Sequence, residues 1–168
     1  WRAGRTYVVY TLDGGVAILA GTVLVSAAAG TTTFAPGGLA GVLAADPLVG
    51  RAAFALLVAG FGVKAALFPL HGWLPEAMVA PTPVSGLLHA VAVVKSGAFG
   101  IARVVLYVFG PDGVRDLGVG VPLAAVAAAT MVLAAVLALR QDRLKRGLAY
   151  STVSQLSYIV LGLAVLTP

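Results

Sequence analysis

The chain has 168 residues, of which 60% are hydrophobic and 10% are charged, and its mean hydropathy is +1.02. A soluble domain carries about 25% charged residues, so this composition predicts a membrane protein. Cysteine is absent, which excludes thiol catalysis, thiolate metal sites and disulfides within these residues, and the net charge of +5 is not gathered into a basic domain that could bind nucleic acid.

Five stretches are long and apolar enough to cross a bilayer, which takes roughly 20 residues of helix. Asp46 is expected to cap the second stretch, with Pro47 as its first helical residue, and Thr82-Pro83 repeats this arrangement before the third. We predict an all-α, polytopic transmembrane helix bundle of about five spans, one of them broken by proline. The spans cover residues 7–29, 47–70 with a broken extension to 80, 83–109, 119–139 and 147–166.

The connections support this division and indicate an orientation. Residues 30–41 form a Thr/Gly/Pro loop, and Gly-Pro-Asp-Gly at 110–113 is a turn signal. With five alternating spans, the N-terminal end and the basic loop 140–146 lie on one side. Lysine and arginine favour cytoplasmic loops, so we expect this side to be cytoplasmic and the protein to be a multi-pass protein of a bacterial inner membrane. The chain begins without methionine and ends after an apolar run, and we expect a fragment of a longer membrane domain.

Lys64 lies deep in the second stretch, shortly before Pro69. A proline in a helix frees the carbonyl four residues earlier, which is Ala65 here, and Pro75 would free His71 in the same way. We therefore expect an interruption from about 65 to 73, whose unpaired backbone must be buried in protein or line a hydrated cavity. A lysine at membrane depth is a functional-site hypothesis, usually for ion or proton traffic. The alternative is a packing kink with Lys64 snorkelling to the interface.

His89 and Lys95 share the third stretch, where a continuous helix would separate them by about 9 Å and about 120°. Ser85 would stack with His89 on one face. Lys95, near the middle of the span, is expected to carry protons, while His89 either titrates or makes an interhelical hydrogen bond. Arg103, nearer the end of the span, is expected to be a snorkelling anchor.

Three further side chains fall in or after the expected break. His71 lies inside it, and Trp73 is interpreted as an interfacial anchor. Glu76 is either a carboxylate for a nearby cation or a solvated loop charge. No metal-ligand spacing connects His71, Glu76 and His89, and no phosphate-binding loop is present, so we expect neither metal nor cofactor in this chain.

The last stretch carries a polar stripe at helical spacing. It consists of Ser151, Ser154, Gln155 and Tyr158. The stripe either lines the same hydrated axis or forms a hydrogen-bonded seam between helices.

The segments KAALFPLHGWLPEAMVAPTPVSGLLHAVAVVKSGAFGIARV and LKRGLAYSTVSQLSYIVLGLA resemble the antiporter-like membrane subunits of NADH–quinone oxidoreductase (respiratory complex I), Mrp-type cation/proton antiporters and membrane-bound hydrogenases. The resemblance implies about fourteen helices with two inverted five-helix bundles, of which this chain is most of the first. It implies that Lys64 is the lysine of the first broken helix, and that His89 and Lys95 link two half-channels. The resemblance also implies an acidic partner for Lys64, on the family's fifth helix, which would lie before Trp1.

The predicted function is therefore proton translocation within a multi-subunit membrane complex, through a relay of Lys64, His89 and Lys95 supported by the residues named above. Partners are other membrane subunits, lipid and protons, and electron transfer would belong to other subunits. One alternative is Na⁺/H⁺ exchange independent of electron transfer, for which Glu76 and the carbonyls of the break could bind the cation. The other is a structural subunit that has lost transport, which the retained lysines oppose.

Overall fold

The computed structural model describes residues 2–31, 33, 39, 46–87 and 92–166. Over these residues the chain is helical and contains no strand. Five of its helices are long and apolar enough to cross a membrane: residues 3–29, 47–65, 93–116, 120–139 and 144–165. The prediction of an all-α, polytopic membrane bundle with about five spans is confirmed.

The helical elements follow one another with short connections. In chain order they are α1 (Arg2–Ala29), α3 (Pro47–Ala65), α4 (Trp73–Ala77), α5 (Thr82–Gly86), α6 (Val93–Arg103), the π-helix η2 (Val104–Phe109), α7 (Gly110–Asp116), α8 (Gly120–Leu139) and α9 (Leu144–Val165).

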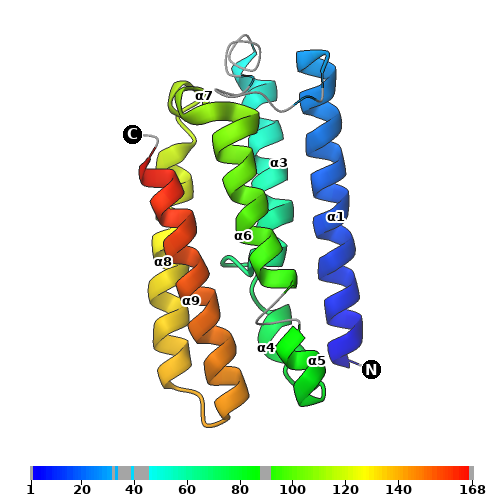
Figure 1. Cartoon of the computed structure of the whole chain (residues 1–168), viewed down its shortest axis with the longest axis vertical. Helices are drawn as coiled ribbons and strands as arrows, with labels where there is room; N and C mark the ends of the chain where they lie inside the picture. The colour runs from blue at the N-terminus through cyan, green and yellow to red at the C-terminus, as the bar shows by residue number, and fades with distance from the viewer. Residues whose placement is uncertain (1, 32, 34–38, 40–45, 88–91, 167–168) are drawn as a thin grey trace.

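The long helices stand side by side, as Figure 1 shows, with α1 against α3, α3 against α6, and α8 paired with α9. The short helices α4 and α5 lie at the end of the bundle that also holds the N-terminus and the α8–α9 connection. Helix α7 lies at the opposite end. The N-terminal residues and the basic loop 140–146 therefore share one end of the molecule, as the alternation of spans predicted.

Glycine permits the close approach of α1 and α3. A methyl group built on Gly60 would lie 2.6 Å from the carbonyl oxygen of Gly14 and 2.9 Å from the backbone nitrogen of Ile18. Because backbone atoms cannot rotate away as a side chain can, only glycine fits at this crossing. The first span is thereby held along the helix that carries Lys64.

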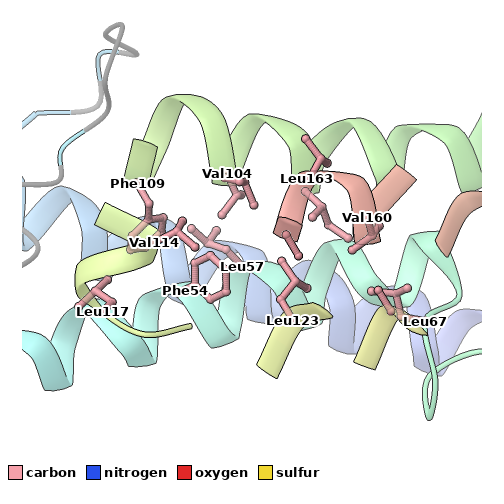
Figure 2. Close-up of a cluster of buried hydrophobic side chains, with 14 of the residues drawn as sticks. Phe54, Leu57, Leu67, Val104, Phe109, Val114, Leu117, Leu123, Val160 and Leu163 are labelled. Atoms are coloured by element: carbon pink, nitrogen blue, oxygen red, sulfur yellow. The ribbon is translucent and has the colours of Figure 1, made fainter. Parts of the chain in front are cut away.

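A buried apolar cluster joins α3 to the helices that follow it, towards the α7 end of the bundle (Figure 2). Phe54 of α3 meets Phe109 of η2 edge to face, with ring centroids 5.2 Å apart. Leu123 of α8 and Val160 of α9 belong to the same cluster, so one core connects α3 with both C-terminal helices. Burial of this surface, together with close packing, fixes α3 within the bundle.

Helix α3 begins as predicted and ends earlier. The Asp46 carboxylate accepts hydrogen bonds from the N–H groups of Leu48 and Val49 at 3.1 and 3.3 Å, which confirms the N-cap. The helix ends at Ala65 rather than at Leu70, because Ala66 adopts a left-handed conformation with φ of 56°. The interruption thus begins immediately after Lys64 and Ala65.

The third span differs more from its prediction. The stretch 83–109 is not one helix but contains α5, α6 and η2, and the membrane-crossing part is residues 93–116. Thr82 does not cap α5, whose N-cap is Pro81 and has no side-chain hydrogen bond. The segment Gly-Pro-Asp-Gly at 110–113 does not form a separate turn but belongs to the short helix α7. Gly110 has a φ of 71°, and the proline that follows it lies in the first turn of α7, where no N–H is needed.

Candidate functional site

The broken segment between α3 and α4 is the centre of the candidate site. The N–H of Leu67 binds the Gly62 carbonyl at 2.9 Å, and the N–H of Ala66 binds the Val63 carbonyl at 3.2 Å. These bonds close the end of α3 with a left-handed residue in place of a further helical turn. Helix α4 then begins at Trp73. The interruption predicted from Pro69 is present between Ala65 and Trp73.

Lys64 lies in the last turn of α3 and is half-buried. Figure 1 shows the end of α3 and the start of α6 at about the same level, with α4 and α5 between them and the end of the bundle. Lys64 is therefore placed inside the bundle, next to the interruption, and not at its end. This position argues against simple snorkelling.

Lys95 is the third residue of α6 and is exposed in this chain. The prediction that it lies near the middle of a continuous span is wrong, because the span starts at Val93. Gly97, two residues later, packs against the backbone of Lys64, so the segments that carry the two lysines are in contact. His89 lies outside the described residues, and its predicted separation from Lys95 therefore stays a prediction.

Trp73 completes the hydrogen bonding of the break from the α4 side. Its indole Nε1–H donates to the Val63 carbonyl at 2.7 Å, and the side chain is only 2% exposed. Its ring packs on Tyr7 of α1, with centroids 5.5 Å apart. The interpretation of Trp73 as an interfacial anchor is wrong, because the indole is buried and serves the backbone next to Lys64.

Thr130 reaches the break from α8. Its hydroxyl oxygen accepts a hydrogen bond from the N–H of Phe68 at 3.0 Å and donates to the Val126 carbonyl at 2.7 Å. In a continued helix the Phe68 N–H would bind the carbonyl four residues earlier, which is that of Lys64. The Thr130 side chain of another span thus accepts the Phe68 N–H, which a regular helix would direct to the Lys64 carbonyl.

His71 and Glu76 both belong to the break and its continuation. The His71 ring stacks on Phe68 at 5.4 Å and lies 6.2 Å from the ring of Tyr150 in α9. His71 Nδ1 and Glu76 Oε2 are buried without a hydrogen-bond partner among the residues that the structure describes. Glu76 is half-buried in α4, so it is not a solvated loop charge.

Pro75 does not free the His71 carbonyl. That carbonyl accepts the N–H of Leu74 at 3.2 Å, and Pro75 lies in the first turn of α4. A proline in a first turn removes only an N–H that has no helical partner. The break therefore results from Pro69 and the left-handed Ala66, while Pro75 helps α4 to begin.

Ser85 is buried in α5, and its predicted stacking with His89 stays a prediction because His89 lies outside the described residues. Its side chain is 5% exposed, and its hydroxyl donates to the Ala80 carbonyl at 2.9 Å. Lys145 Nζ also donates to the Ala80 carbonyl, at 3.4 Å. Ser85 therefore closes the turn between α4 and α5, to which the basic 140–146 loop is joined.

The polar stripe of α9 divides between two surroundings. Ser154 is buried, and its hydroxyl donates to the Met131 carbonyl of α8 at 3.0 Å, as expected of an interhelical seam. Ser151, Gln155 and Tyr158 are exposed in this chain. The seam interpretation thus holds for Ser154, while the other three face away from the packed helices.

Three contributors to the break were missed in the sequence: the Trp73 donor, Thr130 and Gly97. Thr130 gave one signal, because it is the single polar side chain of α8. The indole donor and Gly97 gave none, because the groups they meet are fixed by tertiary packing.

Arg103 lies over the rings of Phe99 and Tyr107, at 5.3 and 4.8 Å, inside its span instead of near the end.

No group of three or more His, Cys, Asp or Glu side chains that could hold a metal ion occurs in the described ranges. Lys64, His71 and Glu76 lie in or next to the interrupted segment, and Lys95 lies two residues before Gly97, which contacts the Lys64 backbone. Such a site can bind or pass small cations and protons, since each of these groups can take part in proton exchange.

Comparison with known proteins places this geometry in a family. The family model described as NADH:quinone oxidoreductase/Mrp antiporter, TM, matches residues 1–167. Chloroplastic NAD(P)H-quinone oxidoreductase subunit 5 of Tecoma stans is 46% identical over 112 residues, which are 66% of this chain and 14% of that protein. The corresponding subunit of Adiantum capillus-veneris is 46% identical over 120 residues, 71% of this chain and 16% of that protein.

Solved structures agree over almost the whole chain. The Mrp complex from Dietzia sp. superposes with a TM-score of 0.84 at 36% identity, covering 99% of this chain and 18% of that one. The membrane-bound sulfane sulfur reductase, an archaeal respiratory membrane complex, gives a TM-score of 0.79 at 33% identity, covering 97% and 33%. This chain thus spans a small part of each relative's length. It belongs to the NADH:quinone oxidoreductase/Mrp antiporter transmembrane family.

Proposed function

We propose that this chain is the lysine-bearing part of a proton path in the membrane arm of a multi-subunit complex. The observation that carries the proposal is the position of Lys64, half-buried in the last turn of a membrane helix that ends one residue later, at Ala65. A charge at this depth is costly and is kept where it serves ion or proton transfer. The family membership supports the same assignment.

In this path, a proton enters at the bundle end that holds α4, α5 and the 140–146 loop, and passes through the broken segment to Lys64. From there it moves by way of His89 to Lys95 and onward. Two features support this route. The segments of Lys64 and Lys95 are in contact at Gly97, and the buried polar atoms of His71 and Glu76 lie in the broken segment and α4. The loop end is the cytoplasmic one in a bacterial inner membrane by its basic residues.

The partners are other membrane subunits, and the redox chemistry of any parent oxidoreductase resides in those subunits. The relatives support this proposal, since the matched structures are an Mrp complex and a respiratory membrane complex. The remaining helices of the parent protein complete the bundle around the exposed faces of α6 and α9. They also supply the acidic partner of Lys64.

A second candidate is Na⁺/H⁺ exchange without electron transfer. Glu76 favours it, because one of its carboxylate oxygens is buried without a partner among the described residues. A carboxylate and the carbonyls of interrupted backbone are ligands of the kind that a hard cation takes. In this candidate, Lys64 exchanges its proton against a cation held near Glu76.

The test is flux through the full parent complex in proteoliposomes, for wild type and Lys64→Ala. Flux driven by NADH and abolished in Lys64→Ala supports the proton path of a respiratory pump. Flux driven by a Na⁺ gradient alone supports exchange, and a loss in Glu76→Gln then locates the cation. Unchanged coupled flux in Lys64→Ala contradicts both candidates.

A further inference from the structure

The Thr130 hydroxyl both donates and accepts a hydrogen bond. Its single proton goes to the Val126 carbonyl of its own helix at 2.7 Å, so its oxygen is free to accept only, and it accepts the Phe68 N–H at 3.0 Å. Because the side chain is 2% exposed, little water can replace it. Without this acceptor, the Phe68 N–H loses the hydrogen bond that directs it towards α8.

The hydrogen bond between Thr130 and the Phe68 N–H affects the end of α3, because it keeps this N–H from bonding to the Lys64 carbonyl. If the Phe68 N–H turned back to the Lys64 carbonyl, α3 would continue past its present end at Ala65 to Leu67. The bond to Thr130 holds it away, and Ala66 keeps its left-handed conformation beside Lys64. On the other side of Lys64 in the sequence, the Trp73 indole donates to the carbonyl of the neighbouring Val63 at 2.7 Å.

We propose that Thr130 is a positioning residue for Lys64: its hydroxyl holds the N–H of Phe68 and thereby keeps α3 interrupted directly after the lysine. This inference rests on the proposed function, since it assigns Thr130 a role in transport through Lys64. Thr130 itself touches no proton of the path. It acts across 62 positions of sequence, from a helix that carries no charged residue.

The experiment compares four variants of the full parent complex in proteoliposomes, with flux expressed per assembled complex. Thr130→Val keeps the shape and removes the acceptor, while Thr130→Ser keeps the hydroxyl. Ser157→Ala is the matched control, because Ser157 is 0% exposed and its hydroxyl donates to Val153 of its own helix at 2.8 Å. Lys64→Ala reports on the proposed function itself.

We expect Thr130→Val to lower flux roughly 3- to 10-fold, the factor by which the loss of one hydrogen bond shifts a conformational equilibrium. Thr130→Ser is expected to keep at least about half of the flux, since it restores the bond. Ser157→Ala is expected to behave as wild type. This rescue by serine separates positioning from a general packing defect, which the smaller serine would share.

Normal flux in Thr130→Val together with lost flux in Lys64→Ala overturns the role of Thr130 and leaves the proposed function standing. Equal losses in Thr130→Val and Thr130→Ser also overturn it, because the hydroxyl would then be irrelevant. Unchanged flux in Lys64→Ala overturns the proposed function itself. If Thr130→Val does not assemble, Thr130→Ala decides instead, against the same serine variant.

Discussion

Gly97 of α6 lies directly against the backbone of Lys64 in α3. A methyl group built on Gly97 would lie 2.7 Å from the carbonyl carbon of Lys64 and would also collide with the backbone nitrogen of Ala65. Backbone atoms on both helices leave no side chain to rotate aside. We therefore expect Gly97→Ala to force α3 and α6 apart at the break, at a cost of about 1–3 kcal/mol. Thermal unfolding of the purified parent complex measures this, and flux should fall with it.

Gly62→Ala is the matched control for this variant. It lies in α3, within the same turn as Lys64, and a methyl group there would meet the Leu67 side chain at 3.4 Å, an ordinary contact. Alanine also favours helix over glycine by about 1 kcal/mol. Gly62→Ala should therefore unfold at or above the wild-type temperature. A Gly97→Ala complex as stable as Gly62→Ala would contradict the close contact between the helices.

Trp73→Phe tests the hydrogen bond that the indole gives to Val63. The ring stays in its place against Tyr7, while the donor to the Val63 carbonyl is lost. That carbonyl still accepts the Ala66 N–H at 3.2 Å, so we expect a loss of about 1 kcal/mol, as for an ordinary buried hydrogen bond. Denaturant unfolding of the purified complex measures it. Tyr7→Phe keeps the aromatic contact and should leave stability unchanged, and a Trp73→Phe complex as stable as the wild type would contradict a stabilising role for the indole hydrogen bond.

Local signals were enough to predict the spans and the start of the break. Asp46 next to Pro47 begins α3 as these residues do in helices generally, and Pro69 cannot continue it. Composition alone gave the five crossing stretches, because bilayer thickness sets their length. These features depend on neighbours within a few residues.

What the sequence did not reveal depends on contacts between distant segments. The stretch 83–109 contains no proline after Pro83, and its sequence predicts one helix, whereas α5 ends at Gly86 and α6 begins at Val93. Thr130 looks like any hydroxyl that bonds back within its helix, and its bond to Phe68 exists only because α8 packs beside the break. Trp73 was misplaced for the same reason, since its burial follows from the packing of α1 and α3 around it.

Asp46→Ala is expected to weaken α3 at the end opposite to Lys64. The carboxylate accepts the N–H groups of Leu48 and Val49, and loss of such a cap costs about 1 kcal/mol. Because the cap lies far from the break along α3, flux per assembled complex should remain at the wild-type level while the unfolding temperature falls. Asp46→Asn keeps an acceptor oxygen and should restore stability. A flux defect in Asp46→Ala at normal stability would contradict the separation of cap and site.

The proposed orientation can be tested with single cysteines, since the chain has none of its own. Asp142 lies in the α8–α9 connection and Asp112 in α7, at opposite ends of the bundle (Figure 1), and both are exposed. In intact cells, a membrane-impermeant maleimide should label Asp112→Cys and not Asp142→Cys if the basic loop faces the cytoplasm as proposed. Inverted vesicles should give the reverse pattern, and denatured protein provides the control for full reactivity at both positions. Mass spectrometry of the labelled peptides separates them from cysteines elsewhere in the complex. The opposite pattern would turn the bundle over, and labelling of both from one side would contradict the separation of the two ends by the membrane.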